Sequence, residues 1–520
     1  MRPVRKNLWP AVWLLLTLAT SSLWAQDLAS FEKRITLKKL DNGLTLIVLE
    51  RPTAPVFSYV TWVNAGSANE VPGITGLAHM FEHMAFKGTD KIGTTNYAAE
   101  AVALQKVEDT YAAYDRERRR ETGRDAAKVA ELEKAWKDAI AEAGKFVQTD
   151  EFSKVVDRAG GAGMNAFTAS DETVFFYSMP SNRFELWAYL ESERFLHPVF
   201  REFYKERDVV TEERRMRTES SPVGRLLEQF LATAFIAHPY GFPTVGWPSD
   251  LKDFSATDAK NFFHKYYVPS NMVVVVVGDV KAAEALPIME KYFGRLPKAP
   301  QPEPLRTIEP KQNAEKTVVL RETAQPIFLE GFHRPAVTDP DAEVYEVISM
   351  LMSNGRTSRL YKSLVRDQKI AAFAQGFNGF PGEKYPSLFT FIAATTKGHT
   401  PAEISAAIDE ELTALKTTDV TPEELQSVKT RAKAQLLRQL DSNNGLALQL
   451  ASYQTMFGDW RELFRSVDRI DKVTAADVKR VANVTFIPSN RTIAYIDNSK
   501  PAQTAPKPAA EAPAAKGAAK

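Results

Sequence analysis

Apolar positions recur along the chain with two different periodicities, and together these predict a mixed α+β fold. Runs that alternate apolar and polar residues, or that are apolar throughout, predict strands, whereas apolar positions three or four apart predict helices. The run at 272–277 is apolar at every position, so we expect a strand that is buried on both faces. Strands are predicted at 35–40, 44–49, 56–63, 173–179 and 272–277, and helices at 184–196 and 202–217.

One segment differs in composition from the chain around it. Residues 104–148 are rich in Ala, Glu, Lys and Arg and contain no proline. The pattern predicts two helices that are separated near 121–124, where Glu-Thr-Gly-Arg interrupts it. We therefore expect an inserted helical hairpin at about 104–150, with its charged residues on a solvated face.

The end of the first half of the chain is repeated at the end of the second half. Residues 255–271 and 474–490 align without gaps at an offset of 219 residues, and six of the 17 aligned positions are identical. Each segment leads through Pro-Ser-Asn into a predicted strand. The repeat indicates that an α+β unit has been duplicated.

These patterns predict the following organisation of the 520 residues. A basic, then apolar leader at 1–25 is typical of a bacterial signal peptide, which places the mature protein in the periplasm; the alternative is an uncleaved anchor. An N-terminal domain spans 26–296 and includes the helical insertion. A proline-rich linker at 297–316 joins it to a C-terminal homologous domain at 317–498, and an Ala/Pro/Lys-rich tail at 499–520 is expected to be disordered.

Composition excludes several classes of function. The formal net charge is +1, so nothing indicates a nucleic-acid partner. Cysteine is absent, which excludes disulfides, thiol nucleophiles and cysteine-based metal sites. After removal of the leader, no remaining stretch is long and apolar enough to predict a stable membrane span.

The strongest chemical signal is the sequence His-x-x-Glu-His at 79–83. On a helix, His79 and His83 are four residues apart, so both imidazoles can reach one metal ion. Glu82 can then reach a water on that metal without binding the metal itself, as in the inverted form of the H-E-x-x-H motif. The alternative is a helix with two satisfied histidines and a surface glutamate.

A catalytic zinc ion needs a third protein ligand, and the helix predicted at 202–217 offers candidates. Glu206 and Glu213 are seven residues apart and share one face of that helix, whereas Glu212 points about 100° away from Glu213. Periodicity alone favours the alternative, a charged surface helix whose glutamates pair with Arg207, Arg214, Arg215 and Arg217.

The motifs together resemble the inverted-motif zinc peptidases of the pitrilysin, insulysin and mitochondrial processing peptidase family. His79-x-x-Glu82-His83 is followed by Glu206-x-x-Val209-x-x-x-Glu213, and further matches occur at 165–168, 269–271 and 355–361. The resemblance implies one Zn²⁺ per chain on His79, His83 and Glu213, with Glu82 as general base and Glu206 supporting catalysis. Asn165 and Ala166 would bind substrate. Glu213 lies 130 residues after His83, and the helical insertion accounts for that long spacing.

For architecture, the resemblance implies two homologous α/β sandwich domains that form a half clamshell, and a dimer that closes the shell. In that family an Arg and a Tyr seven residues later, from the opposite half, help to hold substrate. Here Arg366 is present, but Phe373 occupies the tyrosine position and has no hydroxyl group. A homologous partner subunit that lacks the zinc motif would supply the intact pair. The alternative is that Arg366 and Phe373 are ordinary features of a helix end.

The predicted function is therefore a zinc endopeptidase that hydrolyses peptides or unfolded polypeptides. One alternative is a non-catalytic or partner-dependent peptide-binding subunit of the same fold, and another is a zinc hydrolase that acts on a different amide. The remaining histidines lack spaced partners and are expected to be structural or surface residues: His197, His238, His264, His333 and His399.

Overall fold

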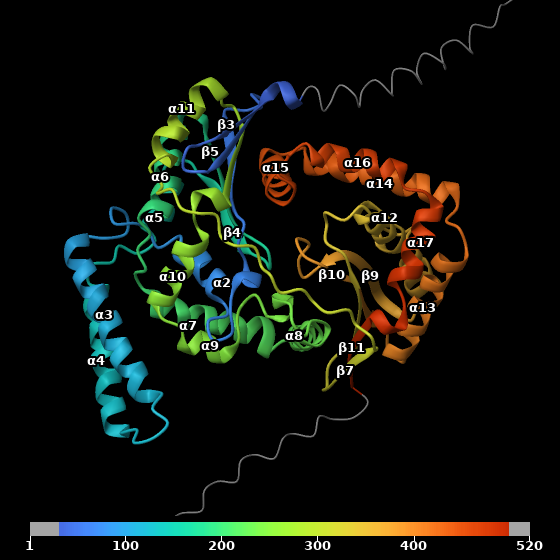
Figure 1. The fold of residues 1–520 in the computed structure, drawn as a ribbon, viewed down its shortest axis with the longest axis horizontal. Helices are drawn as coiled ribbons and strands as arrows, with labels where there is room; N and C mark the ends of the chain where they lie inside the picture. The colour runs from blue at the N-terminus through green and yellow to red at the C-terminus, as the bar shows by residue number, and fades with distance from the viewer. Residues whose placement is uncertain (1–30, 499–520) are drawn as a thin grey trace, which may run out of the picture.

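The computed structural model describes residues 31–498, and its first half is built on a six-stranded mixed sheet (Figure 1). The strand order is β1-β2-β6-β3-β5-β4, in which β2 and β6 are parallel and all other neighbours are antiparallel. As predicted, every residue of β6 is buried. The strands are β1 (Ile35–Lys39), β2 (Thr45–Glu50), β3 (Val56–Val63), β4 (Ala162–Thr168), β5 (Thr173–Pro180) and β6 (Met272–Gly278).

The second half repeats this topology with five strands in the order β7-β11-β8-β10-β9. Its parallel pair is β7 and β11, and the other neighbours are antiparallel, so each strand has a counterpart in the series β2-β6-β3-β5-β4. The duplication inferred from sequence is therefore present in the structure. The strands are β7 (Lys316–Arg321), β8 (Ile327–Arg334), β9 (Ala371–Phe380), β10 (Ser387–Thr395) and β11 (Arg491–Asp497).

The repeated sequence segments occupy equivalent places in the two halves. Ser255 and Thr474 each form a capping box, with Asp258 and Asp477, at the start of the helices α10 (Ala256–Tyr266) and α17 (Ala475–Thr485). Each helix is followed by a Pro-Ser-Asn turn and then by an interior strand of its sheet, β6 or β11. The identical residues of the repeat are thus those that begin the helix and turn the chain into the strand.

Helices cover the faces of both sheets. In the first half they are α2 (Leu77–Met84), α5 (Glu151–Arg158), α6 (Phe184–Leu196), α7 (Phe203–Arg214), α9 (Pro248–Asp253), α10 and α11 (Ala282–Phe293). In the second half they are α12 (Ala342–Ser353), α13 (Pro401–Thr417), α14 (Pro422–Gln439), α16 (Glu462–Lys472) and α17. The segment 297–315 between the two halves contains neither helix nor strand.

The two halves exchange one helix each. Helix α15 (Asn443–Phe457) of the second half packs on β3 and β6 of the first sheet, where Leu446 and Leu450 join a core with Val60 and Val275. Helix α8 (Pro222–Ala234) of the first half packs on β11, β7 and β8 of the second sheet, mainly through Leu226 and Phe230. In Figure 1 these two helices lie between the two sheets. Each sheet is therefore covered in part by a helix from the other half, and this packing fixes the two halves relative to each other.

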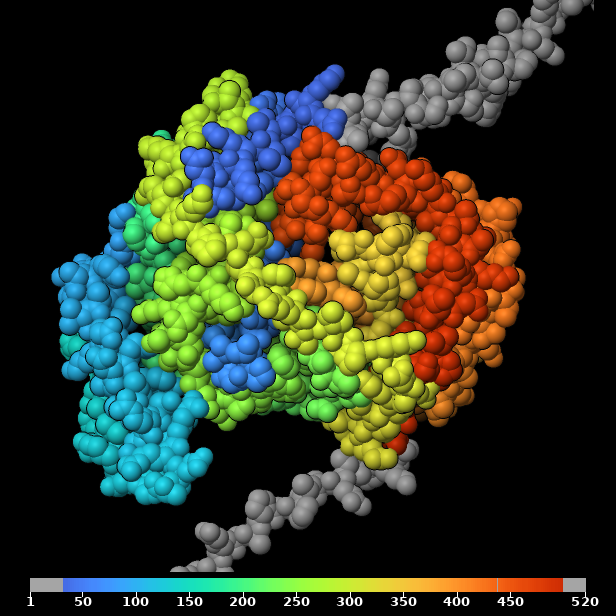
Figure 2. Space-filling view, viewed as in Figure 1, coloured from blue at the N-terminus to red at the C-terminus, as the bar shows by residue number. Residues whose placement is uncertain are grey.

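The helical insertion consists of α3 (Tyr97–Arg118) and α4 (Ala126–Gly144), and it projects from one end of the molecule (Figure 2). Its first helix begins seven residues before the predicted start at 104, because Asn96 caps it through a bond from the Ala99 amide. Aromatic residues of the hairpin surround Arg207 of α7, and Trp136 lies 5.8 Å from that guanidinium. The hairpin is thus packed directly on the helix that carries Glu206 and Glu213.

The predicted signal peptide at 1–25 and the predicted tail at 499–520 lie outside the described residues. Within 31–498, no helix combines the length and apolar character that a membrane crossing needs.

Candidate metal centre

The His-x-x-Glu-His motif lies on α2, and the buried side chain of Glu70 holds the start of this helix in place. Gly76 precedes the helix with φ +95°, and a Cβ atom there would lie 2.8 Å from the Val245 carbonyl oxygen, so glycine is required. The two oxygens of Glu70 accept bonds of 2.7 Å from the Gly76 and Ala78 amides. Burial raises the pKa of Glu70 to about 8, against the opposing effect of these two bonds.

Glu70→Gln is expected to loosen the start of α2, because an amide NH₂ would face one of the two backbone donors. The loss of one buried bond costs about 1–2 kcal/mol, so hydrogen exchange in residues 76–84 should accelerate roughly 5- to 30-fold. The matched control is Glu50→Gln, because Glu50 accepts from the Ala282 amide at the start of α11. It should accelerate exchange at α11 and leave 76–84 unchanged. Unaltered exchange at 76–84 in Glu70→Gln would contradict this role for Glu70.

Helices α2 and α7 bring three potential metal ligands together. Glu213 Oε2 lies 3.7 Å from His79 Nε2 and 3.5 Å from His83 Nε2. One ligand atom from each residue lies within 4.8 Å of the other two. For a tetrahedral zinc ion with ligands at about 2.0–2.1 Å, the ligand atoms would be about 3.4 Å apart. The donor set and its spacing therefore fit a zinc ion.

The protonation of His79 and the ring orientation of His83 suit metal binding. Burial, together with the neighbouring His83 and Arg217, lowers the pKa of His79 to about 3, so its ring is neutral. His83 Nδ1 donates to Glu206 Oε1 at 2.9 Å, which leaves Nε2 of the same ring free toward Glu213. Burial acts to lower the pKa of His83, but its hydrogen bond and attraction to Glu206 outweigh that effect and raise it.

Glu206 is held as an anion behind His83. Its Oε2 lies 2.6 Å from the ammonium of Lys87, which lies just beyond the end of α2. Burial acts to raise the pKa of Glu206, but the hydrogen bonds from His83 and Lys87 lower it to about 2. A carboxylate bonded to the distal nitrogen of a histidine fixes the tautomer and the orientation of that ring.

Glu82 faces the cleft from the same helix. Its Oε2 accepts a bond of 2.6 Å from the Thr168 hydroxyl at the end of β4. Burial raises the pKa of Glu82, with the Thr168 bond as an opposing effect. Glu82 is not among the three residues that could hold a metal ion, so its carboxylate is available for proton transfer.

A cleft of about 1110 Å³ surrounds these residues. Asn165 and Ala166 line it together with the motif histidines. Both belong to β4, which is an edge strand of the sheet, and Asn165 is exposed. The outer edge of β4 thus offers unpaired backbone groups beside the candidate metal group.

The structure does not bring Arg366 and Phe373 to this cleft. Arg366 lies on the π-helical turn Tyr361–Asp367 (η6) of the second half, where it pairs with Asp367 at 2.6 Å. Phe373 lies on the edge strand β9 and is 39% exposed. Neither residue lines the cleft, which is formed by the first half alone.

Sequence reasoning missed two contacts of the site. Lys87 lies beyond the end of α2 at Met84, so helical spacing gave no signal for this partner of Glu206. Arg217, four residues after Glu213, donates to Glu213 Oε1 at 2.7 Å. The sequence pattern indicated such a pair only for a surface helix, not beside a metal ligand. Of the other histidines, His333 lies 3.2 Å from the Ala234 carbonyl oxygen and His399 lies 3.2 Å from Glu403, so both have structural partners.

Comparison with known proteins agrees with the division of the chain into a first half that carries the motif and a second half that does not. A family model described as insulinase (peptidase family M16) matches residues 46–116, which include the motif helix. A second one, described as the peptidase M16 inactive domain, matches residues 253–432. The inactive-domain match falls mostly on the second half, which carries no His-x-x-Glu-His.

Similar proteins support the same assignment over most of the chain. The zinc protease PqqE of Helicobacter pylori is 29% identical over 498 residues, which cover 93% of this chain and 96% of the relative. A crystal structure of a protease from Helicobacter pylori matches with a TM-score of 0.74 and 26% identity, covering 89% of this chain and 99% of that one.

The periplasmic protease PqqL of Escherichia coli has the same fold, with a TM-score of 0.65 and 17% identity. The match covers 89% of this chain but only 48% of PqqL, so this chain spans about half of that protein. With the motif helix, the duplicated sheets and these matches, the chain belongs to peptidase family M16, the family of pitrilysin, insulysin and the mitochondrial processing peptidases.

Proposed function

We propose that this protein is a zinc endopeptidase that hydrolyses peptides or unfolded polypeptides. One observation carries the proposal: His79, His83 and Glu213 converge, with Glu82 beside them, in a cleft bordered by an exposed strand edge. The zinc protease names of similar proteins support it. A non-catalytic peptide-binding role is less well supported, because all motif residues are present and the inactive-domain match begins at residue 253.

In this proposal each residue has a distinct task. His79, His83 and Glu213 would hold one zinc ion, which would supply the chemistry of water activation and carbonyl polarisation. Glu82 accepts a proton from the attacking water and delivers it to the leaving amine. Thr168 holds the Glu82 carboxylate toward the cleft, and Glu206 keeps the His83 ring in the required tautomer.

We propose that substrate binds as an additional strand along β4, at Asn165 and Ala166. An extended peptide can pair with an edge strand through backbone hydrogen bonds, which gives affinity with little dependence on side chains. Such pairing needs an extended substrate, so it favours peptides and unfolded chains over folded proteins.

We further propose that the protein is exported to the periplasm and acts as a dimer. The leader pattern at 1–25 supports export, and the name of PqqL, a periplasmic protease, agrees with it. This chain spans about half of PqqL, which supports a second copy or a homologous subunit as the other half of the shell. Arg366 of that other half would then contact substrate, and Phe373 favours a partner that carries the tyrosine.

Chelation of the metal tests the proposed function. The purified protein should cleave a quenched fluorescent peptide library, and a zinc chelator should reduce the rate to background because water activation is lost. Stoichiometric zinc should restore the rate. Absence of cleavage by zinc-loaded protein, alone and with any co-purified homologue, would contradict the proposal, as would cleavage that a chelator does not affect.

Glu206→Gln is expected to weaken zinc binding about 10- to 100-fold, because the ring of His83 would lose its anionic partner. Competition with a chromophoric chelator measures this change directly. Glu212→Gln is the matched control, since Glu212 lies on the same helix and forms an ion pair with the exposed Arg215. Equal zinc affinity in the two variants would show that Glu206 does not support His83.

A further inference from the structure

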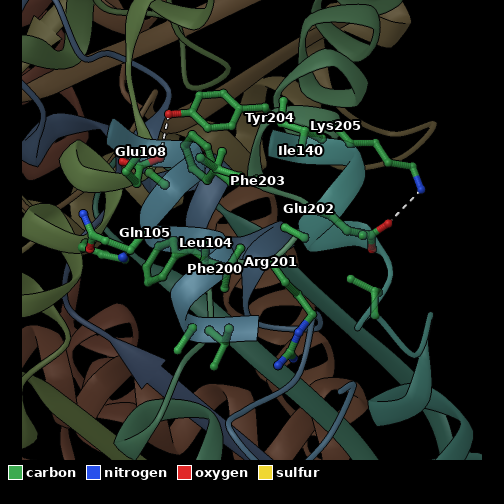
Figure 3. A pocket seen from close by; sticks show the side chains of 18 of the residues that line it. Leu104, Gln105, Glu108, Ile140, Phe200, Arg201, Glu202, Phe203, Tyr204 and Lys205 are labelled. Carbon is green, nitrogen blue, oxygen red and sulfur yellow. Dashed lines mark hydrogen bonds and ion pairs between the residues drawn. The ribbon is translucent and has the colours of Figure 1, made fainter. Parts of the chain in front are cut away.

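A second cavity, of about 360 Å³, lies between the base of the helical hairpin and the start of α7 (Figure 3). Its walls come from α3, α4, the segment 198–202, the first turn of α7 and α10. This volume is at the lower end of the range of roughly 300–1,000 Å³ that is typical of small-molecule sites. Of its lining residues, only Lys205 also lines the cleft around the candidate metal group.

The walls of this cavity are mainly apolar. The lining includes these apolar residues: Leu104 and Val107 of α3, Ile140 of α4, Phe200 before α7, and Phe203, the first residue of α7. Figure 3 shows Leu104, Phe200 and Phe203 around the same space. Such walls suit the hydrocarbon part of a small ligand, whose burial would provide most of the affinity.

Most of the charged groups around the cavity already have hydrogen-bonding or ionic partners within the protein. Arg201 bonds to Glu100 at 2.8 Å and to three backbone carbonyls. Glu108 accepts bonds from the Tyr204 hydroxyl and from Thr257. Lys205 pairs with Glu202 at 2.9 Å, as the dashed line in Figure 3 marks. None of these groups needs a ligand.

Lys260 is the exception. Its ammonium lies 6.0 Å from the centre of the Phe200 ring, and no carboxylate of residues 31–498 lies within 4.0 Å of it. The cavity therefore combines an apolar interior with one cation that lacks an ionic partner. We propose that it binds a small amphipathic carboxylate, with the hydrocarbon part among the apolar walls and the carboxylate on Lys260.

Octanoate is the probe for this site. In isothermal titration calorimetry, the purified full protein should bind one octanoate per chain, and octylamine should bind at least about tenfold more weakly because it would face Lys260 with a like charge. Lys260→Met should weaken octanoate binding about tenfold or more. The matched control is Lys265→Met, on the same helix and outside the cavity, which should bind octanoate as the unmodified protein does.

A blocking variant tests the location independently. Ala101 is half-buried and lines the cavity, so Ala101→Phe should fill it and abolish octanoate binding while an unchanged melting temperature reports intact folding. Undetectable binding at millimolar octanoate, or equal binding by Lys260→Met and the unmodified protein, would overturn the proposal. Zinc-loaded and chelator-treated protein should both bind octanoate, so this test does not depend on peptidase activity.

Discussion

Glu82→Gln is expected to lower kcat for peptide cleavage by about 10²- to 10⁴-fold, because glutamine cannot accept the proton of the attacking water. The replacement preserves the size of the side chain and can keep a hydrogen bond with the Thr168 hydroxyl. Glu82 is not one of the three residues that could hold the metal, so zinc content should remain at one ion per chain. Steady-state cleavage of a fluorogenic peptide, with zinc measured on the same sample, checks both parts.

The control for this variant is Glu212→Gln, which removes an exposed carboxylate at the margin of the same cleft. It should cleave at the rate of the unmodified protein. If Glu82→Gln cleaves at that rate as well, Glu82 is not the general base. If the unmodified protein binds zinc and does not cleave peptide, that result would instead support a non-catalytic peptide-binding function.

Local spacing was sufficient to place three residues of the candidate site together. His79, Glu82 and His83 lie within five residues on one helix, so helical geometry alone places them on one side. Glu213 could not be assigned in this way, because periodicity alone favoured a charged surface helix. The resemblance to a known family favoured it, and the structure brings its carboxylate to 3.5 Å from His83 Nε2.

Prediction of the fold from the sequence was limited in a similar way. The 219-residue repeat predicted the duplication, since its identical residues form the same caps and turns in both halves. It did not predict the exchange of α8 and α15 between the two sheets. An apolar helical face carries no information on which of two similar sheets it will cover, so this feature depends on tertiary packing.

The sequence also did not predict contacts between segments that are distant along the chain. Glu70 caps the motif helix from six residues before Gly76 in an extended loop, and no capping-box spacing marks it. The cavity at Lys260 requires α3, α4, α7 and α10 together. Only the packing of the hairpin on α7 creates it, and amphipathic patterns do not specify that arrangement.

Glu213→Gln should weaken zinc binding on the order of 10³-fold and remove peptide cleavage with it. Glu213 is the only anion among the three residues, and its loss leaves two neutral imidazoles to hold a divalent cation. The expected loss exceeds the 10- to 100-fold change typical of groups that contact a metal only through another ligand. Competition with a chromophoric chelator measures zinc affinity, and Asp208→Asn, an exposed carboxylate of α7 in the same cleft, is the control.

The two variants together separate metal binding from proton transfer. Glu82→Gln should retain zinc and lose turnover, whereas Glu213→Gln should lose both, and excess zinc should partly restore cleavage only in Glu213→Gln. Unchanged zinc affinity in Glu213→Gln would exclude this residue as a ligand. The third ligand would then have to come from another carboxylate that lines the cleft, and Glu206, already bonded to His83 and Lys87, would be the first to examine.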